Sequence, residues 1–535
     1  MSSEDLKTES ERRRTFAIIS HPDAGKTTLT EKLLLHGGAI HLAGSVKARK
    51  AQKHAVSDWM EIEKQRGISV TSSVLQFHYQ NYCINILDTP GHQDFSEDTY
   101  RTLMAADSAV MVIDVSKGVE EQTKKLFRVC KQRHIPIFTF INKLDRFGKN
   151  PFDLLEEIEQ VLGINAYPMN WPIGIDGNYL GVYTRKTGTA ELFPRGSQSG
   201  QKIENTVKGK LSDKSIAEAI GDEISAALSE DIELLDTAGN QFSLEEVAAG
   251  ELTPVFFGSA MTNFGVRPFL EEYLALAPAP GEHQSTIGAI RPDDEAFSAF
   301  VFKIQANMNP AHRDRLAFIR ICSGKFTKGM SVYHMQGGKT IKLSQPQQMM
   351  AQERTMVEEA YAGDIIGLFD PGILGIGDTL CLEKKKFQFE DFPLFPPELF
   401  ARVYPKDSMK RKQFLKGIMQ LTQEGAVQVF RQPDSAIEAF IVGVVGNLQF
   451  EVLEYRLKHE YSVDLVMERQ PFTVAKWLSG EKTAKKELKG MDSCLFVLDR
   501  AERPVALFNN EWGFNWAEKQ NPDTIFSNVP LTNQE

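Results

Sequence analysis

The sequence predicts a multidomain α/β protein: a first domain with a mostly parallel sheet and an insertion, then an antiparallel β-barrel domain, then an α+β domain. The chain has 535 residues, and at roughly 150 residues per domain this is enough for three or four domains. Two proline-rich segments, residues 277–281 and 392–397, interrupt it. Proline cannot continue a helix or donate to a sheet ladder, so we expect domains over residues 1–280, 281–391 and 392–535.

Five short apolar runs that alternate with helical stretches predict the sheet of the first domain. The runs are continuously hydrophobic, as strands buried on both faces must be, which indicates a parallel sheet. The interval from Phe147 to Thr253 is too long for one crossover connection, so we expect an insertion at about residues 165–253, with a hairpin near residues 179–185. The expected strands are Phe16–Ile19, Ile84–Leu87, Ala109–Ile113, Ile137–Ile141 and Val255–Phe257.

Shorter patterns predict the two later domains. Between residues 281 and 391, alternating segments are separated by glycine-containing turns, which is typical of a small antiparallel barrel. After residue 392 a helix, a strand and a second helix follow in order, which favours an α+β domain; the pattern does not decide whether residues 480–535 are a separate unit. The barrel segments are Phe297–Ile304, Arg315–Ile321, Met330–His334 and Thr340–Leu343; the later elements are a helix carrying Phe414, Ile418 and Leu421, a strand near Phe440–Val445, and a helix through Leu448, Val452, Tyr455 and Lys458.

Composition excludes several classes of protein. Hydrophobic residues make up 42% of the chain and charged residues 25%, as in ordinary globular proteins. The five cysteines form no CxxC pair, which argues against a disulfide framework or zinc cluster and fits a reducing, cytoplasmic location. The polar start lacks a signal peptide and no apolar run is long enough for a membrane helix. We therefore expect no membrane partner. The net charge of −10 speaks against a nucleic-acid coat protein, and we expect no DNA partner.

Charge is unevenly spread along the chain. Residues 401–490 hold 15 Lys or Arg and 11 Asp or Glu, whereas residues 222–251 hold nine acids and no Lys or Arg. The basic region contains a cluster around a helix start, which we interpret as a candidate ribosome-facing surface; a solvated helix face is the alternative. No role is assigned to the acidic stretch. The basic cluster consists of Lys406, Lys410, Arg411, Lys412 and Lys416.

A phosphate-binding loop follows the first expected strand. The pattern GxxxxGK[ST] is present with one departure, Ser20 at the position of the first glycine, where a small residue still permits the turn. Backbone N–H groups at a helix N-terminus can surround phosphates, Lys26 can neutralise β and γ oxygens, and the Thr27 hydroxyl can reach Mg²⁺. The candidate nucleotide-binding residues here are Ser20, His21, Pro22, Asp23, Ala24, Gly25, Lys26, Thr27 and Thr28.

A second motif, DTPGH, stands at the end of the second expected strand. A bare DxxG is weak by itself, but the carboxyl ends of strands are where α/β sheets bind ligands. Asp88 can hold Mg²⁺ through water, and the Gly91 N–H can meet a γ-phosphate. His92 is placed to orient an attacking water, which makes it the candidate catalytic residue, with a structural histidine as the alternative. The nucleotide-binding candidates are Asp88, Thr89, Pro90 and Gly91.

The third motif, NKLD, ends the strand at residues 137–141 and predicts guanine recognition. The two oxygens of Asp145 can accept from N1–H and the 2-amino group of guanine, and adenine has neither donor, so an unpaired carboxylate penalises ATP. Asn142 is expected to brace the loop and the Lys143 stem to cover the base. Gly258-Ser259-Ala260 supplies a backbone N–H for the guanine oxygen. The candidates are Asn142, Lys143, Leu144, Asp145, Ser259 and Ala260.

A polar segment at residues 59–69 lies between the first two motifs. A segment that reaches the nucleotide needs a hydroxyl for Mg²⁺ and the γ-phosphate, and Ser69 is the candidate. A plain solvated helix end is the alternative. The expected magnesium ligands are thus Thr27, Ser69 and Asp88.

The segments SHPDAGKTT, EKQRGIS, DTPGH, NKLD and GSA together resemble the G domain of the translational GTPases. DTPGH is much more like that group than like the small signalling GTPases. Residues 362–365 and 377–380 look like the second domain of these proteins, and residues 446–452 resemble a third-domain segment of elongation factor G. Over essentially the whole chain, the resemblance is to the bacterial GTPases of translation termination. Ser20 and Ser69 depart from the usual glycine and threonine of the superfamily.

The resemblance implies a GTP-dependent switch on the ribosome that dissociates class I release factors once the peptide has been freed, without stop-codon specificity. GTP and GDP are then the ligands, with Mg²⁺, and the partners are ribosomal RNA, ribosomal proteins and class I release factors. No arginine finger is evident in the chain, and in such proteins the large-subunit RNA is understood to place His92; Pro22 and Ile68 are expected to flank it. We expect a monomer in solution.

Two alternatives remain open from the sequence. One is another ribosomal GTPase, either translocase-like or a stress factor. The other is a binding module that nucleotide controls without turnover, although the presence of both Lys26 and His92 speaks against it.

Overall fold

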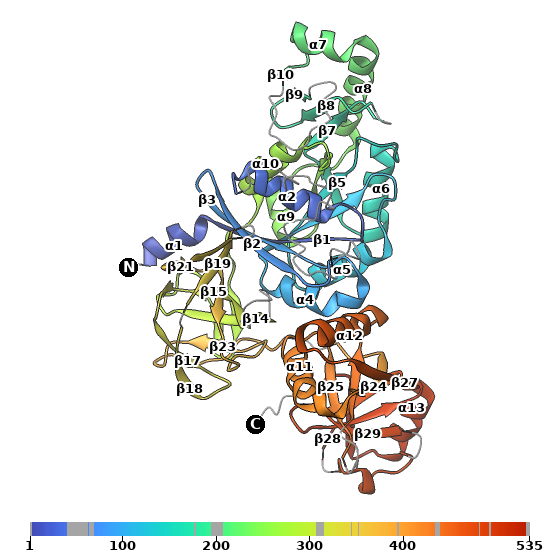
Figure 1. The fold of residues 1–535 in the computed structure, drawn as a ribbon. Coiled ribbons are helices and arrows are strands. Elements are labelled where there is room, and N and C mark those ends of the chain that lie inside the picture. The colour runs from blue at the N-terminus through green and yellow to red at the C-terminus, as the bar shows by residue number, and fades with distance from the viewer. Residues whose placement is uncertain are drawn as a thin grey trace.

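The structure is a computed structural model whose elements fall into three consecutive parts of the chain (Figure 1). No helix of the described chain is long and apolar enough to cross a lipid bilayer. The structure describes residues 3–39, 63, 69–175, 178–193, 207–306, 315–343, 345–350, 353–392, 395–433, 439–480, 482–491 and 494–530.

The first part is built on a seven-stranded sheet in which every neighbouring pair is parallel except β2 with β3. All five predicted strands lie in it, so the predicted α/β class is confirmed. Alternate β1 residues enter two different cores: Phe16 and Ile18 face one, and Ala17 and Ile19 face the other. In spatial order the strands are β2 (Ser73–Tyr79), β3 (Tyr82–Asp88), β1 (Arg13–Ser20), β4 (Ser108–Asp114), β5 (Ile137–Asn142), β11 (Leu252–Phe257) and β6 (Asn165–Pro168).

Helices cover both faces of this sheet, as burial of both faces requires (Figure 1). A further helix at the N-terminus lies beside the second part of the chain. The helices are α1 (Ser3–Glu11), α2 (Lys26–His36), the 3₁₀ turn η1 (Gln93–Phe95), α4 (Ser96–Met104), α5 (Glu121–Gln132), α6 (Pro151–Leu162) and α10 (Val266–Leu276).

The interval at residues 165–253 is only partly separate from the main sheet. Its first strand, β6, pairs in parallel with β11 at the sheet edge, where Pro168 is tolerated. The remainder forms a four-stranded antiparallel sheet with helices. The hairpin expected near residues 179–185 is longer than predicted: that range holds β8 alone, and its partner β9 follows at residues 189–192. Two acids of the acidic stretch attach α8 to this sheet: Asp231 accepts from Trp171 at 2.9 Å and Asp236 from Arg185 at 2.6 Å. These elements are β7 (Asn170–Ile173), β8 (Gly181–Thr184), β9 (Thr189–Leu192), β10 (Val207–Lys210), α7 (Lys214–Ile220), α8 (Asp222–Ala238) and α9 (Leu244–Ala249).

The second part consists of antiparallel strands around an apolar core of its own, as the sequence predicts. All four expected segments are strands here, because alternate residues of each fill that core. The strands are β12 (His283–Ser285), β13 (Gly288–Ile290), β14 (Ser298–Ala306), β15 (Arg315–Ser323), β16 (Lys325–Thr327), β17 (Ser331–His334), β18 (Lys339–Lys342), β19 (Gln347–Met350), β20 (Glu353–Met356), β21 (Glu359–Tyr361), β22 (Ile365–Phe369) and β23 (Thr379–Cys381).

Within its described residues, the third part combines an eight-stranded sheet with three α-helices, and contains the predicted helices and strand. The described residues after 480 continue this sheet, and Trp477, Val497 and Leu507 share a core with Phe400 and Phe430. The elements are β24 (Leu399–Pro405), η2 (Ser408–Lys410), α11 (Arg411–Gln423), β25 (Gln428–Arg431), β26 (Phe440–Val444), α12 (Asn447–Tyr461), β27 (Leu465–Gln470), β28 (Val474–Gly480), η3 (Lys485–Glu487), β29 (Cys494–Leu498), β30 (Pro504–Phe508), α13 (Glu511–Gln520) and β31 (Thr524–Ser527).

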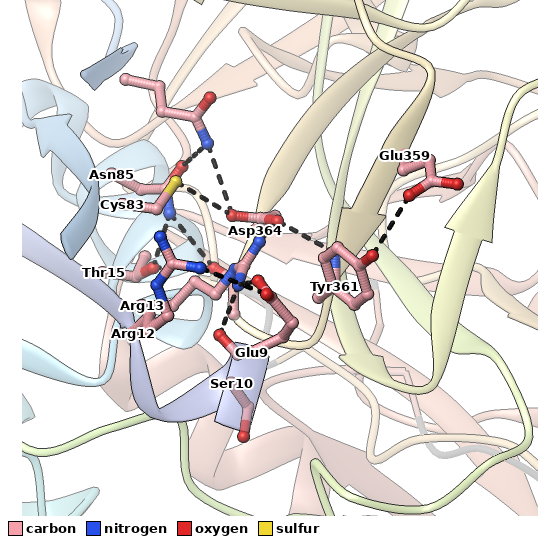
Figure 2. A network of polar contacts seen from close by, with 12 residues as sticks. Glu9, Ser10, Arg12, Arg13, Thr15, Cys83, Asn85, Glu359, Tyr361 and Asp364 are labelled. Atoms are coloured by element: carbon pink, nitrogen blue, oxygen red, sulfur yellow. Dashed lines mark hydrogen bonds and ion pairs between the residues drawn. The ribbon is translucent and has the colours of Figure 1, made fainter. Parts of the chain in front are cut away.

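A buried polar network joins the first part to the barrel (Figure 2). The Arg13 guanidinium donates to Asp364 at 3.2 Å and also pairs with Glu9. Thr15 donates to the Gly363 carbonyl at 2.7 Å. Arg13 and Asp364 are both buried, so removing either one would leave the other charge in the interface with fewer partners.

Candidate functional site

The phosphate-loop candidates form the turn between β1 and α2. Ser20 is the last residue of β1, and Lys26 is the first of α2. Gly25 precedes the helix with a φ of 98°, and a Cβ there would lie 2.3 Å from the Asn142 side-chain nitrogen. Glycine is thus required on two grounds, a left-handed backbone and the close approach of another loop.

The Lys26 ammonium lies where the first two motifs meet. Lys26 Nζ donates to Ser20 Oγ at 3.3 Å. A Cβ on Gly91 would lie 2.5 Å from this Nζ and 3.2 Å from the backbone of Pro22. The space beside the lysine is therefore kept open by a residue without a side chain, as the close approach of a phosphate requires.

Asn142 connects three separate loops. Its Nδ2 donates to the Ala24 carbonyl at 2.9 Å. Its Oδ1 accepts from the N–H groups of Lys143 and Ala260, each at 2.8 Å. The side chain is buried at the end of β5, so it holds the phosphate loop, the NKLD loop and the loop after β11 in one arrangement.

Asp145 and Lys143 complete the NKLD loop. Ser259 Oγ donates to the Asp145 carboxylate, which brings together two residues that are 114 positions apart. Lys143 Nζ donates to the Asp23 carbonyl at 2.5 Å and to Asp114 Oδ2 at 2.7 Å. The lysine stem is therefore fixed along the phosphate loop.

Asp114 is a residue that the sequence reasoning missed. It is the last residue of β4, a strand that is followed by no recognised motif. Burial would raise the pKa of Asp114, but hydrogen bonds from Lys143 and Ser116 outweigh that effect and lower the pKa below its usual value. The signal that could have found it is its position, since it ends a strand between two strands that carry motifs.

The DTPGH segment leaves β3 at Asp88, which is buried. Thr89 is fixed by a 2.7 Å hydrogen bond to the Ile18 carbonyl, and Thr99 donates to the Pro90 carbonyl at 3.2 Å. The His92 side chain is 37% exposed and begins the η1 turn. The segment is thus anchored at Thr89 to β1 and at Pro90 to α4, while the histidine ring keeps access to solvent.

Ser69 begins the described chain that leads into β2. Glu63, also described, accepts from the N–H groups of Val70 and Thr71 at 2.9 Å and 3.2 Å. Ile68 and the rest of the predicted 59–69 segment, apart from Glu63 and Ser69, lie outside the described residues.

A pocket of about 320 Å³ brings the motifs together. Six of the nine phosphate-loop candidates, Ser69 and the Gly91-His92 pair line it, whereas Ser20, His21 and Ala24 do not. Two further lining residues, Arg146 and Met261, were not singled out from the sequence, because neither belongs to a recognised motif. The lining residues are Pro22, Asp23, Gly25, Lys26, Thr27, Thr28, Ser69, Gly91, His92, Lys143, Arg146 and Met261.

The residues present suit a nucleotide and its magnesium ion. The glycines at positions 25 and 91 leave room that a Cβ would fill. In the described chain, no three His, Cys, Asp or Glu side chains are grouped to hold a metal ion. Mg²⁺ that accompanies a nucleotide is bound by one or two protein oxygens, phosphates and water, so Thr27, Ser69 and Asp88 are of the right chemistry.

Comparison with known proteins divides the chain as the fold does. Residues 11–279 match the elongation factor Tu GTP binding domain, and residues 296–383 match elongation factor G domain 2. Residues 389–518 match the C-terminal domain of class II release factor RF3. Peptide chain release factor 3 of Symbiobacterium thermophilum is 57% identical, covering 98% of both chains. The chain belongs to the peptide chain release factor 3 family.

Other comparisons agree with this assignment. Peptide chain release factor 3 of Listeria monocytogenes is 56% identical, covering 97% of this chain and 98% of its own. That of Gloeobacter violaceus is 53% identical over 99% of both. A solved structure from Thermus thermophilus has a TM-score of 0.69 at 23% identity, covering 89% of this chain and 71% of its own, which shows the shared fold. The predicted translational GTPase of termination is thereby confirmed.

Proposed function

We propose that this chain is a ribosome-stimulated GTPase that promotes dissociation and recycling of class I peptide chain release factors, and that it stimulates termination without stop-codon specificity. The proposal is carried by the hydrogen bonds of the Asn142 side chain. They join three loops, each at the end of a parallel strand, into one nucleotide site. The partners are ribosomal RNA, ribosomal proteins and class I release factors. We propose that it acts as a monomer, in the cytoplasm where the ribosome works.

The phosphate loop, Asp88–Gly91 and the NKLD loop are the proposed binding residues for GTP and GDP. Asp145 reads the guanine edge, with Ser259 holding its carboxylate, while the Ala260 N–H donates to Asn142. Lys26 neutralises phosphate oxygens next to Gly91. Mg²⁺, when bound at Thr27, Ser69 and Asp88, would neutralise charge on the phosphate oxygens.

His92 is the proposed catalytic residue. It lines the nucleotide pocket beside Gly91, so its ring can orient the water that attacks the γ-phosphate. GTP holds the segments of Ser69 and His92 in order, and hydrolysis to GDP and phosphate releases them. The rate of GTP hydrolysis therefore sets how long the protein stays in its GTP-bound conformation.

The test compares single-turnover GTP hydrolysis with termination complexes and with vacant ribosomes. We expect stimulation by ribosomes, and tighter binding of the GTP-loaded protein to termination complexes that hold a class I release factor. Equal binding to both would instead indicate a translocase-like or stress factor. Absence of multiple-turnover phosphate release with ribosomes would indicate a binding module without turnover.

A further inference from the structure

The Asp94 carboxylate links the proposed catalytic segment to the C-terminal part of the chain. Asp94 lies in η1, two residues after His92, and is only 7% exposed. Its Oδ2 accepts from the Leu448 N–H at 2.7 Å. Leu448 is the second residue of α12, and the helix is preceded by Gly446, which has no side chain to cap it. Asp94 thus supplies the acceptor that a helix N-terminus usually takes from the side chain of its N-cap residue.

The second Asp94 oxygen faces His92. The Asp94 N–H donates a hydrogen bond of 3.3 Å to His92 Nδ1, and Asp94 Oδ1 lies 3.2 Å from the same ring nitrogen. The two groups make opposite demands, because the carboxylate needs a proton on Nδ1 and the N–H needs a bare nitrogen. A hydrogen bond to a charged acceptor is the stronger, so the carboxylate favours Nδ1–H. This leaves Nε2 as an acceptor, which is the role that orienting a water requires.

Helix α12 also contacts both segments that border the nucleotide pocket. Val70, which follows Ser69, and Phe95, which follows Asp94, share a small apolar cluster with Val452 of α12. Figure 1 shows α12 next to α4, at the boundary between the first and third parts of the chain. A shift of α12 would therefore act on both segments at once.

We propose that Asp94 is a positioning residue for His92, and that α12 fixes Asp94 from the C-terminal domain. The inference rests on the proposed role of His92 in hydrolysis. With α12 docked, the Leu448 N–H holds one carboxylate oxygen and the other holds the His92 ring. When α12 moves away, the carboxylate loses its anchor and the ring loses its fixed tautomer. Hydrolysis is thereby conditional on the position of the C-terminal domain.

Asp94→Asn in the full-length chain tests the first half of the proposal. The amide oxygen can still accept from Leu448, but the charge that favours Nδ1–H is gone. We expect single-turnover GTP hydrolysis with saturating ribosomes to fall by about 10- to 100-fold, as for other misplaced catalytic groups. The Kd for GTP should stay within about twofold, because Asp94 is not in the lining of the pocket.

Gly446→Ala tests the second half from the opposite domain. Its Cβ would lie 2.0 Å from Asp94 Cγ, and its φ of −144° suits any residue, so the change acts through space alone. We expect a slower hydrolysis rate, and no further loss when it is combined with Asp94→Asn. Gly443→Ala is the matched control, because its Cβ would meet Pro397 at 2.8 Å inside the C-terminal domain, and neither Asp94 nor α12.

A second measurement does not depend on the ribosome. In protein labelled with ¹⁵N-histidine, the His92 ring signals are those that disappear in His92→Gln. We expect Nδ1 to carry the proton in the parent and Nε2 in Asp94→Asn. Parent-like hydrolysis in both variants, effects that multiply in the double variant, or an unchanged tautomer would each overturn the proposal. A parent that hydrolyses no GTP with ribosomes would instead contradict the proposed function, while the tautomer still decides the role of Asp94.

Discussion

At the scale of single residues, the nucleotide site depends on a few buried polar side chains that each serve several loops. Asn142 contacts Ala24 and Ala260 through opposite ends of one amide, so its removal would uncouple the phosphate loop from the loop after β11. Lys143 has a similar role, since Asp114 and Asp23 fix its ammonium group. Specificity and catalysis are expected from residues that these side chains position.

Guanine specificity is expected to depend on Asp145. Asp145→Asn presents one donor and one acceptor where the parent presents two acceptors, and xanthine has a carbonyl in place of the 2-amino group of guanine. The preference for GTP over XTP should shift by about 10⁴-fold, the range found where buried polar partners are mismatched. Competition binding with GTP and XTP measures this. Asp153→Asn, at an exposed position of α6, is the control, and a variant that still binds GTP tightly and ignores XTP would show that this loop does not read the base.

His92→Ala should leave nucleotide affinity near normal and slow hydrolysis with saturating ribosomes by on the order of 10²-fold or more, because the ring contacts water and not the phosphates. Single-turnover cleavage of GTP is the measurement. His78→Ala changes an exposed histidine of β2 and should behave as the parent. An unchanged rate in His92→Ala would make His92 a structural residue only.

At the scale of elements, helix α11 carries positive charges at its N-terminus, a position where they do not stabilise the helix. Lys410, Arg411 and Lys412 stand at its N-terminus, where no acid is present in the first turn. Cations are unfavourable at a helix N-terminus, which carries partial positive charge. Local rules are broken most often where function requires it, and under the proposed function the polyanion that would meet this surface is ribosomal RNA.

Charge reversal at Lys406, Lys412 and Lys416, all exposed, is therefore expected to weaken ribosome binding. The log–log salt dependence of binding should flatten by about one unit for each phosphate that the variant no longer neutralises. Affinity for GTP should not change, because the site lies in the first domain. Reversal at the exposed Lys214, Lys339 and Lys384 provides the control; if both triple variants bind ribosomes as the parent does, α11 presents only a solvated face.

The sequence predicted those elements whose pattern is local. Each motif loop was placed at the end of an apolar run, and β1, β3, β5 and β11 end next to those loops. Strand β2 was missed because it lies at the edge of the seven-stranded sheet and pairs there only with β3, in antiparallel orientation. Strand β6 was missed because its four residues include Pro168 and give no strand pattern.

Contacts between domains could not be predicted from sequence. Gly363-Asp364 was noted only for its resemblance to other proteins, and Leu448 for a resemblance and for its place in an expected helix. The structure shows that both segments contact the first domain. Asp94 and Leu448 are 354 positions apart, and no periodicity or spacing connects residues at that separation. Contacts of this kind are recognised only in the three-dimensional structure of the whole chain.

At the scale of the whole molecule, the first domain is held from two sides. The barrel contacts it through Arg13 and Asp364, and through Lys303, which donates to Ser72 Oγ at 3.0 Å (Figure 2 shows the first network). The C-terminal domain contacts it through α12 and Asp94. Ser72 and Asp94 lie just beyond Ser69 and His92, so the position of each outer domain is linked to the nucleotide site.

Asp364→Ala should destabilise the folded protein. The change leaves the Arg13 guanidinium buried without its partner from the barrel, and also removes acceptors for the Tyr361 N–H and Gln76. Breaking a buried pair from one side costs about 3 kcal/mol or more of unfolding free energy. Urea unfolding measures this decrease, with Asp391→Ala as an exposed control. Equal stability of the two variants would show that the barrel does not depend on this network.

The most direct test of the account follows a fluorescent class I release factor on ribosomes whose nascent peptide has already been released. Adding the purified protein with GTP should speed departure of the factor, and adding it with GDP should not. The acceleration should be the same for factors that read different stop codons. A departure rate that GTP-loaded protein leaves unchanged, while the same preparation hydrolyses GTP on those ribosomes, would contradict the proposed function.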